Sequence, residues 1–319
     1  MAHHRLEASP DTVHWGHFDA RLSPALTIDS GDTVTITTVS GLAGMLPAAD
    51  SGFTIAPALS AIHGKLEPKL GPHICTGPVV IRDAKAGDIL EVRIKAVELL
   101  DDWGFNLILP GAGGLPDDFT EQRLIFIGLD KQKKVGRLPW GADIPLRPFF
   151  GVMGVAPSPT LGTVSSVPPG SHGGNIDNKE LVPGAILYLP IHVDGALFSV
   201  GDGHGAQGDG EVCLTAIETG LSGTFELHLH KSKAGSKPLE WPYAETPTHL
   251  ITMAFDSDLD VCASTALRDM IAAICARTGL SREDAYTLCS LAADLRVTQI
   301  VNGNKGVHVM LDKTYLKRT

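Results

Sequence analysis

The stretch DGALFSVGDGHGAQGDGEVCLTAIE, residues 194–218, has two strand-like ends joined by a polar, glycine-rich segment. Residues 196–200 and 212–217 are mostly apolar and include β-branched and aromatic side chains, which favours strands. Between them, residues 201–211 hold five glycines, three carboxylates, one histidine and one glutamine. So many glycines predict backbone angles or close approaches that a side chain would forbid. We call residues 194–218 the central motif, because the rest of the chain is organised around it.

The polar residues of the central motif suggest a chemical role. Asp202, His204, Asp209 and Glu211 are of the types that bind divalent cations and transfer protons. Asp-Gly pairs are also ordinary turn chemistry, so a plain loop between two strands is the alternative interpretation. Phosphate binding is disfavoured, because no Gly-Lys-Ser/Thr is present and three carboxylates would repel an anion. The spacing therefore leaves a turn and a metal or acid–base site as the two interpretations.

Composition limits the partners. A formal net charge of −10 without a basic cluster argues against nucleic acid and against anionic membrane surfaces. No apolar run approaches the ~20 residues that span a bilayer, and the N-terminus lacks the apolar core of a secretory signal. The five cysteines form no CxxC pair and fit free thiols in a reducing compartment. We therefore expect a cytoplasmic protein that binds neither nucleic acid nor membrane.

Two regions of different character follow from the residue patterns. Residues 1–255 contain many short β-branched runs between Gly and Pro turns, such as residues 33–39 and 223–231. Residues 260–277 instead repeat apolar side chains at helical spacing, and Gly279 fits the end of that helix. These patterns predict a mainly β protein with a smaller α+β part at the C-terminus.

The C-terminal part carries a second set of local signals. Ser281-Arg282-Glu283-Asp284 resembles a capping box and predicts a second helix that continues to about Leu295. A strand over residues 296–302 and another over residues 307–311 should follow. We therefore expect a helical hairpin followed by two strands.

The central motif resembles the signature of the acetamidase/formamidase family, G-A-L/G-x-S-x-G-D-x-H-x-x-Q-G-D-G-E. Further resemblance to the family runs from about residue 12 to residue 312 and includes residues 13–16, 73–78 and 174–181. The residues of the central motif that match the signature are Gly195, Ala196, Leu197, Ser199, Gly201, Asp202, His204, Gln207, Gly208, Asp209, Gly210 and Glu211.

The resemblance implies a fold and an activity. It implies antiparallel β-sandwich or barrel-like units in a catalytic region, residues 1–255, on which an α+β segment, residues 256–319, packs with its helical hairpin. It implies metal-dependent hydrolysis of a small linear amide, formamide or acetamide, to the carboxylic acid and ammonia. A divalent metal is expected, with zinc first and calcium as the alternative. We also expect a homo-oligomer, specifically a homodimer.

The resemblance also assigns roles to residues. Asn175 and Asp177 stand two apart, which places both side chains on one side of an extended chain; an Asx turn is the alternative. His73 lies near a Gly-Pro break, where spacing alone fits a structural histidine or a ligand equally. The predicted metal ligands are Asp202, His204, Asp177 and His73. The predicted catalytic residues are Glu211, as general acid and base, with His204 and Asp202; the predicted substrate contacts are Gln207, Asp209, Asn175 and Trp103.

Other functions are compatible with the same residues. The site could hydrolyse a larger or cyclic amide such as a lactam. A non-catalytic, metal-dependent β-sandwich that binds a ligand would present similar Asp/Asn/Gly loops, and it would not need Glu211. A structural cation site in a different hydrolase would leave activity intact after chelation. A serine amidase mechanism has little support, because the chain lacks a Lys-Ser-Ser arrangement in a Ser/Gly-rich context.

Overall fold

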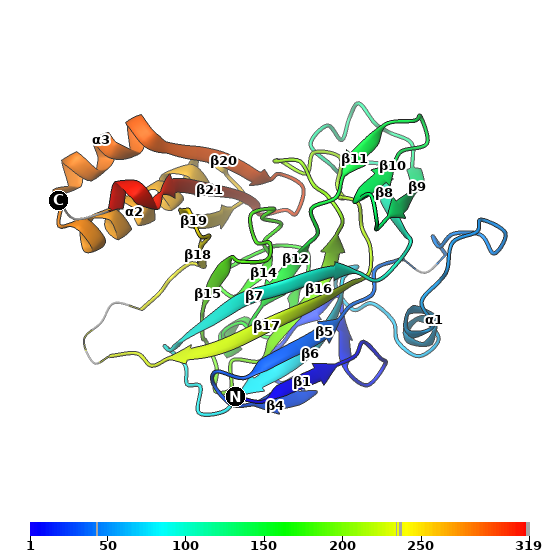
Figure 1. Cartoon of the computed structure of the whole chain (residues 1–319), viewed down its shortest axis with the longest axis horizontal. Helices are drawn as coiled ribbons and strands as arrows, with labels where there is room; N and C mark the ends of the chain where they lie inside the picture. The colour runs from blue at the N-terminus through cyan, green and yellow to red at the C-terminus, as the bar shows by residue number, and fades with distance from the viewer. Residues whose placement is uncertain (43, 234, 236–237, 317–319) are drawn as a thin grey trace.

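The computed structural model describes residues 1–42, 44–233, 235 and 238–316, and it confirms the mainly β fold with a helical pair near the C-terminus (Figure 1). One large sheet has nine strands, mostly antiparallel, with a parallel pair at one edge. Its order is β1 (His3–Leu6), β5 (Thr33–Thr37), β17 (Leu221–His230), β7 (Ile89–Leu99), β15 (Ile186–Pro190), β18 (Tyr243–Glu245), β19 (His249–Asp256), β21 (Lys305–Asp312) and β20 (Ala293–Gln299).

Within the described residues, three further sheets complete the β structure. The six-stranded sheet consists of β14 (Gly173–Asn175), β12 (Phe149–Gly154), β16 (Phe198–His204), β6 (Ile74–Ile81) and β2 (Val13–Trp15), with β4 (Leu26–Ile28) parallel to β6. The four-stranded sheet consists of β11 (Asp143–Pro145), β10 (Val135–Arg137), β9 (Arg123–Asp130) and β8 (Trp103–Ile108). The smallest pairs β13 (Val164–Ser165) with β3 (His17–Phe18).

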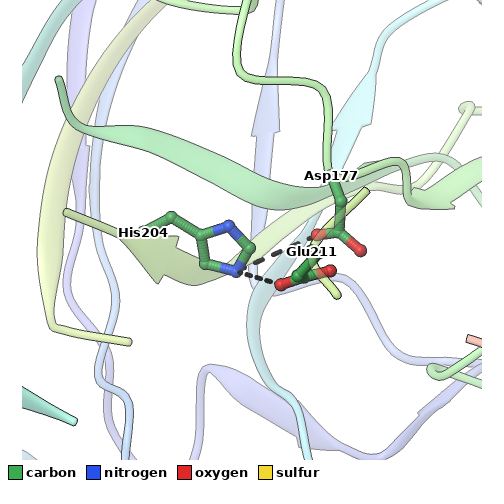
Figure 2. A group of neighbouring side chains, drawn as sticks. All are labelled: Asp177, His204 and Glu211. Atoms are coloured by element: carbon green, nitrogen blue, oxygen red, sulfur yellow. Dashed lines mark ion pairs between the residues drawn. The ribbon is translucent and has the colours of Figure 1, made fainter. Parts of the chain in front are cut away.

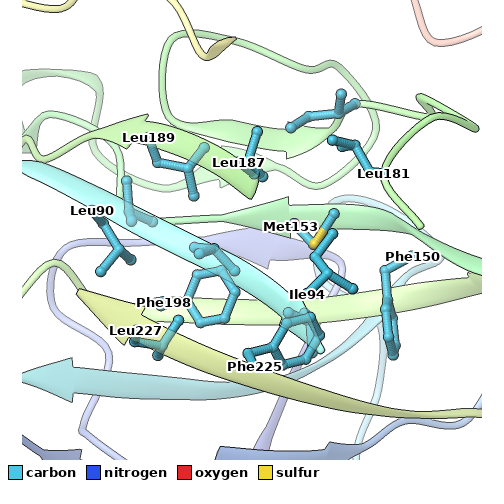
Figure 3. Packing of buried hydrophobic residues seen from close by; sticks show 14 of the residues in the cluster. Leu90, Ile94, Phe150, Met153, Leu181, Leu187, Leu189, Phe198, Phe225 and Leu227 are labelled. Atoms are coloured by element: carbon cyan, nitrogen blue, oxygen red, sulfur yellow. The ribbon is translucent and has the colours of Figure 1, made fainter. Parts of the chain in front are cut away.

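The main core lies between the nine-stranded and six-stranded sheets, which pack face to face as a sandwich (Figure 3). Leu90 of β7 and Phe225 of β17 come from one sheet, and Met153 of β12 and Phe198 of β16 come from the other; all four are fully buried. The rings of Phe198 and Phe225 meet edge to face, with centroids 5.9 Å apart. The core therefore fixes β12 and β16, the two strands that lead into the site.

In the part of the chain that the structure describes, α-helices occupy two places in the fold. The short α1 (Pro57–His63) buries Leu59 and Ile62, and two single 3₁₀ turns occur at η1 (Pro159–Leu161) and η2 (Lys313–Leu316). The long α2 (Leu259–Thr278) packs on β19 and β21 and beside α3 (Arg282–Ala292). None of the described helices is both long and apolar enough to cross a membrane.

The C-terminal elements follow their local signals, with one difference. Gly279 ends α2 with a φ of +82°, and the Ser281 hydroxyl accepts a hydrogen bond from the Asp284 N–H at 3.0 Å to begin α3. The predicted extension of this helix to Leu295 is wrong: α3 ends at Ala292 and β20 begins at Ala293. Pairing of β20 with β21 over this stretch outweighs the helical pattern, and it adds the C-terminal strands to the nine-stranded sheet.

The central motif differs from its predicted structure in two ways. Asp202 and His204 lie within β16 instead of in a loop, because glycine lets the neighbouring backbone come close: a Cβ on Gly201 would lie 2.5 Å from the carbonyl oxygen of Ile74. The predicted strand over residues 212–217 is wrong. That segment is irregular, and Glu211 and Leu214 have φ angles of +44° and +114°, which interrupt a β ladder.

Candidate metal centre and its cavity

Four buried carboxylates surround the Nε2 atom of His204. β16 provides Asp202 and His204, the loop after β16 provides Glu211 and Glu218, and Asp177 follows β14. From Nε2 of His204, the nearest carboxylate oxygens of Asp202 and Glu218 lie at 3.2 and 3.3 Å, and those of Asp177 and Glu211 both lie at 3.9 Å. Figure 2 shows Asp177 and Glu211 converging on the imidazole. Side chains from separate segments of the chain thus meet at one imidazole nitrogen.

The backbone that carries these acids is unusual. Asp177, Asp202 and Glu211 have φ angles of +51°, +56° and +44°, in the left-handed region that non-glycine residues seldom occupy. Such conformations persist where the surrounding structure holds them, and they concentrate at functional sites. Asp177 is therefore not in the extended chain that its spacing from Asn175 suggested, although both residues reach the site.

A glycine of β12 makes room for the cluster. A Cβ added to Gly151 would lie 2.5 Å from Oδ1 of Asp177, 2.5 Å from Oδ2 of Asp202 and 2.7 Å from Cε1 of His204. Real Cβ atoms do not approach other atoms so closely, so a side chain at this position would displace the acids. The bare backbone of Gly151 is one wall of the cluster.

Gln207 fixes the orientation and tautomer of His204. The Gln207 amide nitrogen donates to the carbonyl oxygens of Asp177 at 2.8 Å and Thr298 at 3.4 Å, which directs its Oε1 towards Nδ1 of His204, 2.9 Å away. Because Oε1 only accepts, Nδ1 carries the proton and donates it. Nε2, which points at the four acids, is then the ring nitrogen that can bind a metal ion when the imidazole is neutral. This arrangement is typical of a metal-binding histidine. Burial lowers the pKa of His204, but the charges of Glu218 and Asp202 outweigh burial and raise it.

Two buried atoms of the cluster lack a hydrogen-bond partner among the described residues. They are Nε2 of His204 and Oδ1 of Asp177. The other oxygen of Asp177 accepts from the amide of Asn302 at 2.5 Å. Unpaired buried polar atoms are costly and call for a specific explanation. A divalent cation bound by both atoms supplies that explanation, and carboxylate oxygens with an imidazole nitrogen form a suitable donor set.

Burial and mutual repulsion raise the pKa values of three acids in the cluster. Burial, with the charge of Asp177, raises the pKa of Glu211 well above its usual range, and burial with the charge of Asp202 raises the pKa of Asp177. Burial together with Asp202 raises the pKa of Glu218 to about 8. So many acids in one buried place are stable together only when some are protonated or a cation offsets their charge. The electrostatics therefore also fit a cation.

A cavity of about 240 Å³ adjoins the cluster. Asp202, Glu211 and Glu218 form part of its polar wall, together with polar side chains from elsewhere in the chain, His73, Asn175 and Asn302. Most of the remaining lining is apolar. Three of the clustered acids can thus reach a small molecule bound in this cavity.

Asn175 presents an unsatisfied acceptor at the cavity. Its side-chain nitrogen donates to the carbonyl oxygen of Val167 at 3.1 Å, which sets the amide orientation. Its Oδ1 is buried and has no hydrogen-bond partner among the described residues. An acceptor held in this way suits a donor group on a ligand, such as an N–H.

The other predicted site residues lie at different distances from the centre. His73 lines the cavity, and its Nε2 lies 3.8 Å from Oδ2 of Asp202. Two groups of described residues have ligand atoms within 4.8 Å of one another, Asp177/His204/Glu211 and Asp202/His204/Glu218, and neither includes His73. The ligand role of His73 stays a prediction.

The predicted substrate contacts separate in space. Asn175 lines the cavity, whereas Gln207 supports His204 behind it. Asp209 forms an ion pair with Lys179 at 2.9 Å and lines a larger, more open cavity of about 720 Å³. Trp103 is buried, donates to the carbonyl oxygen of Thr54 and is not among the residues that line the cavity. The residue of β8 that lines the cavity near this position is Phe105.

Three important residues did not stand out from the sequence. Glu218 is the last residue of the central motif, and only the return of the loop brings it to His204. Asn302 ends the predicted strand over residues 296–302, but nothing in that segment indicates its contact with Asp177. Gly151 has no side chain to carry chemistry, so its importance shows only in its contacts with Asp177, Asp202 and His204. Of these three residues, only Glu218 could have been noticed in the sequence, because it is a carboxylate at the end of the central motif.

Fold and site together define a mainly β protein with a buried carboxylate–histidine centre, suited to a divalent cation, beside an apolar cavity. The model of the acetamidase/formamidase family matches residues 6–165 and 162–311, so the chain belongs to this family. A formamidase of Methylophilus methylotrophus is 29% identical over 242 residues, which cover 58% of this chain and 59% of that protein.

An acetamidase of Mycolicibacterium smegmatis is 27% identical over 222 residues, covering 51% of this chain and 54% of the relative. The chain therefore spans less than two thirds of the length of these curated relatives. Among solved structures, an acetamidase from Bacillus halodurans has a TM-score of 0.81 at 30% identity and covers 98% of each chain. An acetamidase from Yersinia enterocolitica has a TM-score of 0.84 at 27% identity, covering 99% of this chain and 93% of that one.

Proposed function

We propose that this protein is a metal-dependent amidohydrolase that converts a linear amide and water to the carboxylic acid and ammonia. The observation that carries the proposal is the His204 cluster, whose unpaired Nε2 and Oδ1 atoms adjoin the cavity wall where Asp202, Glu211 and Glu218 are accessible. Membership of the family, and the names formamidase and acetamidase of its relatives, support the same reaction.

We assign the metal to His204, Asp177 and Asp202. His204 offers a free Nε2, Asp177 a free Oδ1, and Asp202 an oxygen 3.2 Å from that Nε2. Bound there, a divalent cation supplies a Lewis acid that polarises the amide carbonyl and lowers the pKa of water. Zinc is our first choice because it favours histidine with carboxylates in a small set, and calcium is the alternative because the cluster is rich in carboxylates.

Glu211 is the proposed general base and acid. It is buried, it faces the cavity, and burial raises its pKa, which makes its carboxylate a stronger proton acceptor. Its carboxylate takes a proton from the attacking water and returns it to the nitrogen of the departing ammonia. Oδ1 of Asn175 accepts a hydrogen bond from the amide NH₂ and orients the scissile bond.

The test combines ammonia release with metal content on the same samples. Wild-type protein should release ammonia from an amide, lose that activity on chelation and regain it with zinc. Glu211→Gln should lower kcat by about 10²-fold or more while metal content stays at the wild-type value, because the general base is lost but the ligands are not.

Glu121→Gln, an exposed site, is the matched control and should behave as wild type. Loss of metal in Glu211→Gln would make Glu211 a ligand instead of the base. Full activity after complete removal of metal would overturn the metal-dependent mechanism.

A further inference from the structure

The cavity is larger than formamide or acetamide requires, and much of its lining is apolar. β8 contributes Phe105 and Leu107, and the loop after β8 adds Leu109 and Ala112. Leu42 and Leu214 also line the cavity. Asp202, Glu211 and Glu218 of the His204 cluster line the same cavity, so the apolar wall and the reacting centre face one space. They adjoin at Phe105, whose backbone N–H donates to the carbonyl oxygen of Glu218 at 3.0 Å.

Volume sets the size of the group that this wall accommodates. An apolar cavity of about 150 Å³ lined by similar side chains holds benzene. The cavity here measures about 240 Å³. A benzene-sized group therefore leaves space equal to about three water molecules at ~30 Å³ each, which suffices for the carboxamide and the attacking water. Formamide or acetamide would leave most of the wall without contacts.

We infer that the preferred substrate is a primary amide whose acyl group carries an apolar chain or ring of about four to six carbons. This inference rests on the proposed amidase activity and names its substrate class. The acyl group lies against Phe105, Leu107 and Leu109, and the NH₂ group donates to Oδ1 of Asn175. The carbonyl carbon then lies between them, next to the carboxylates that face the cavity.

Hydrophobic burial gives the expected size of the effect. Each methylene removed from water strengthens binding about fourfold. Pentanamide has three methylenes more than acetamide, so its kcat/KM should be higher by roughly 10- to 60-fold, depending on how completely the chain is buried. The increase should come mainly through a lower KM, because these contacts form in the ground state as well as in the transition state.

The experiment measures kcat/KM of the metal-loaded protein for formamide, acetamide, butanamide, pentanamide and benzamide by ammonia release. A rise along the aliphatic series, with benzamide also accepted, supports the inference. Equal or higher values for acetamide than for pentanamide overturn it and leave the proposed function standing. No ammonia from any of the five amides overturns the proposed function itself.

A variant then locates the acyl group. Ala112→Phe adds a ring to the apolar wall and should lower the ratio of pentanamide to acetamide kcat/KM at least tenfold. Leu115→Phe, on the same loop but 59% exposed, is the matched control and should keep the wild-type ratio. Ala112→Leu serves as a milder second variant where the larger ring impairs folding. An unchanged ratio in both Ala112 variants would show that the acyl chain lies elsewhere.

Discussion

At the scale of single residues, a glycine shapes the centre as much as its charged groups do. Gly151→Ala would place a methyl group 2.5 Å from an oxygen of Asp177 and 2.5 Å from an oxygen of Asp202. We expect metal affinity to fall by at least about tenfold, because both proposed ligands must move. Isothermal titration of the chelated protein with zinc measures this change.

Gly208→Ala is the control for that substitution. Gly208 lies in the central motif close to Gln207, yet a Cβ there meets no atom within 4 Å. Its metal affinity should equal that of the wild type. Equal affinities for Gly151→Ala and Gly208→Ala would contradict the idea that the backbone of Gly151 defines the centre.

Residue chemistry explains what could be predicted of the site from the sequence. Asp202, His204 and Glu211 stand out because carboxylates and an imidazole alternate with glycine in one segment. Glu218 and Gly151 do not, since their importance comes from contacts with residues distant in the chain. A sequence pattern shows which chemistry a side chain is capable of, but it does not show which atoms of the folded protein contact that side chain.

At the scale of elements, local signals predicted the helices better than the strand at the centre. Asp258 caps the start of α2 by accepting hydrogen bonds from the N–H groups of the first turn, and Gly279 ends the helix in a left-handed conformation. Both features depend on neighbouring residues alone. The Gly-Asp-Gly-His run of β16 instead has the composition of a turn. It forms a strand because β6 and β12 pair on either side of it, and those contacts are not encoded locally.

The cap of α3 gives a prediction at the same scale. Ser281→Ala removes the hydroxyl that accepts from the Asp284 N–H at 3.0 Å, and it should lower the free energy of unfolding by about 1 kcal/mol. Urea denaturation measures the change. Ser264→Ala, inside α2, is the control and should change stability by less than about 0.5 kcal/mol. Equal effects of the two substitutions would show that the Ser281 cap adds nothing specific.

At the scale of the whole molecule, the strand count predicted the β class, but the pairing of nine strands into one sheet could not be predicted. β1 pairs in parallel with β5, and β15 pairs with both β7 and β18, across long separations in sequence. Register depends on which faces are buried in the assembled sandwich, and that is known only when both sheets are present. The sandwich in turn places β14, β16 and the loop after β16 where their acids meet.

Buried histidines make the stability of this assembly depend on pH. Burial lowers the pKa of His14 to about 3 and those of His172 and His308 to about 4. Below pH ~6.5 these histidines therefore bind protons in the unfolded chain but remain neutral in the folded protein. The contribution of these neutral side chains to the free energy of unfolding is complete above pH ~6.5. It is lost as the pH falls towards 4, by up to ~1.4 kcal/mol per pH unit for each histidine.

His172→Leu tests this prediction, because His172 lies outside the His204 cluster and packs against the ring of Phe18, with centroids 5.3 Å apart. The free energy of unfolding, from urea curves of wild type and variant, is compared at pH 8 and pH 5. The difference at pH 8 reports packing alone, since the imidazole is neutral in both states there. Between pH 8 and pH 5 the variant should gain about 2 kcal/mol relative to wild type, because it no longer takes up a proton on unfolding. A difference that stays constant across this range would mean that the imidazole of His172 takes up its proton equally in the folded and unfolded states.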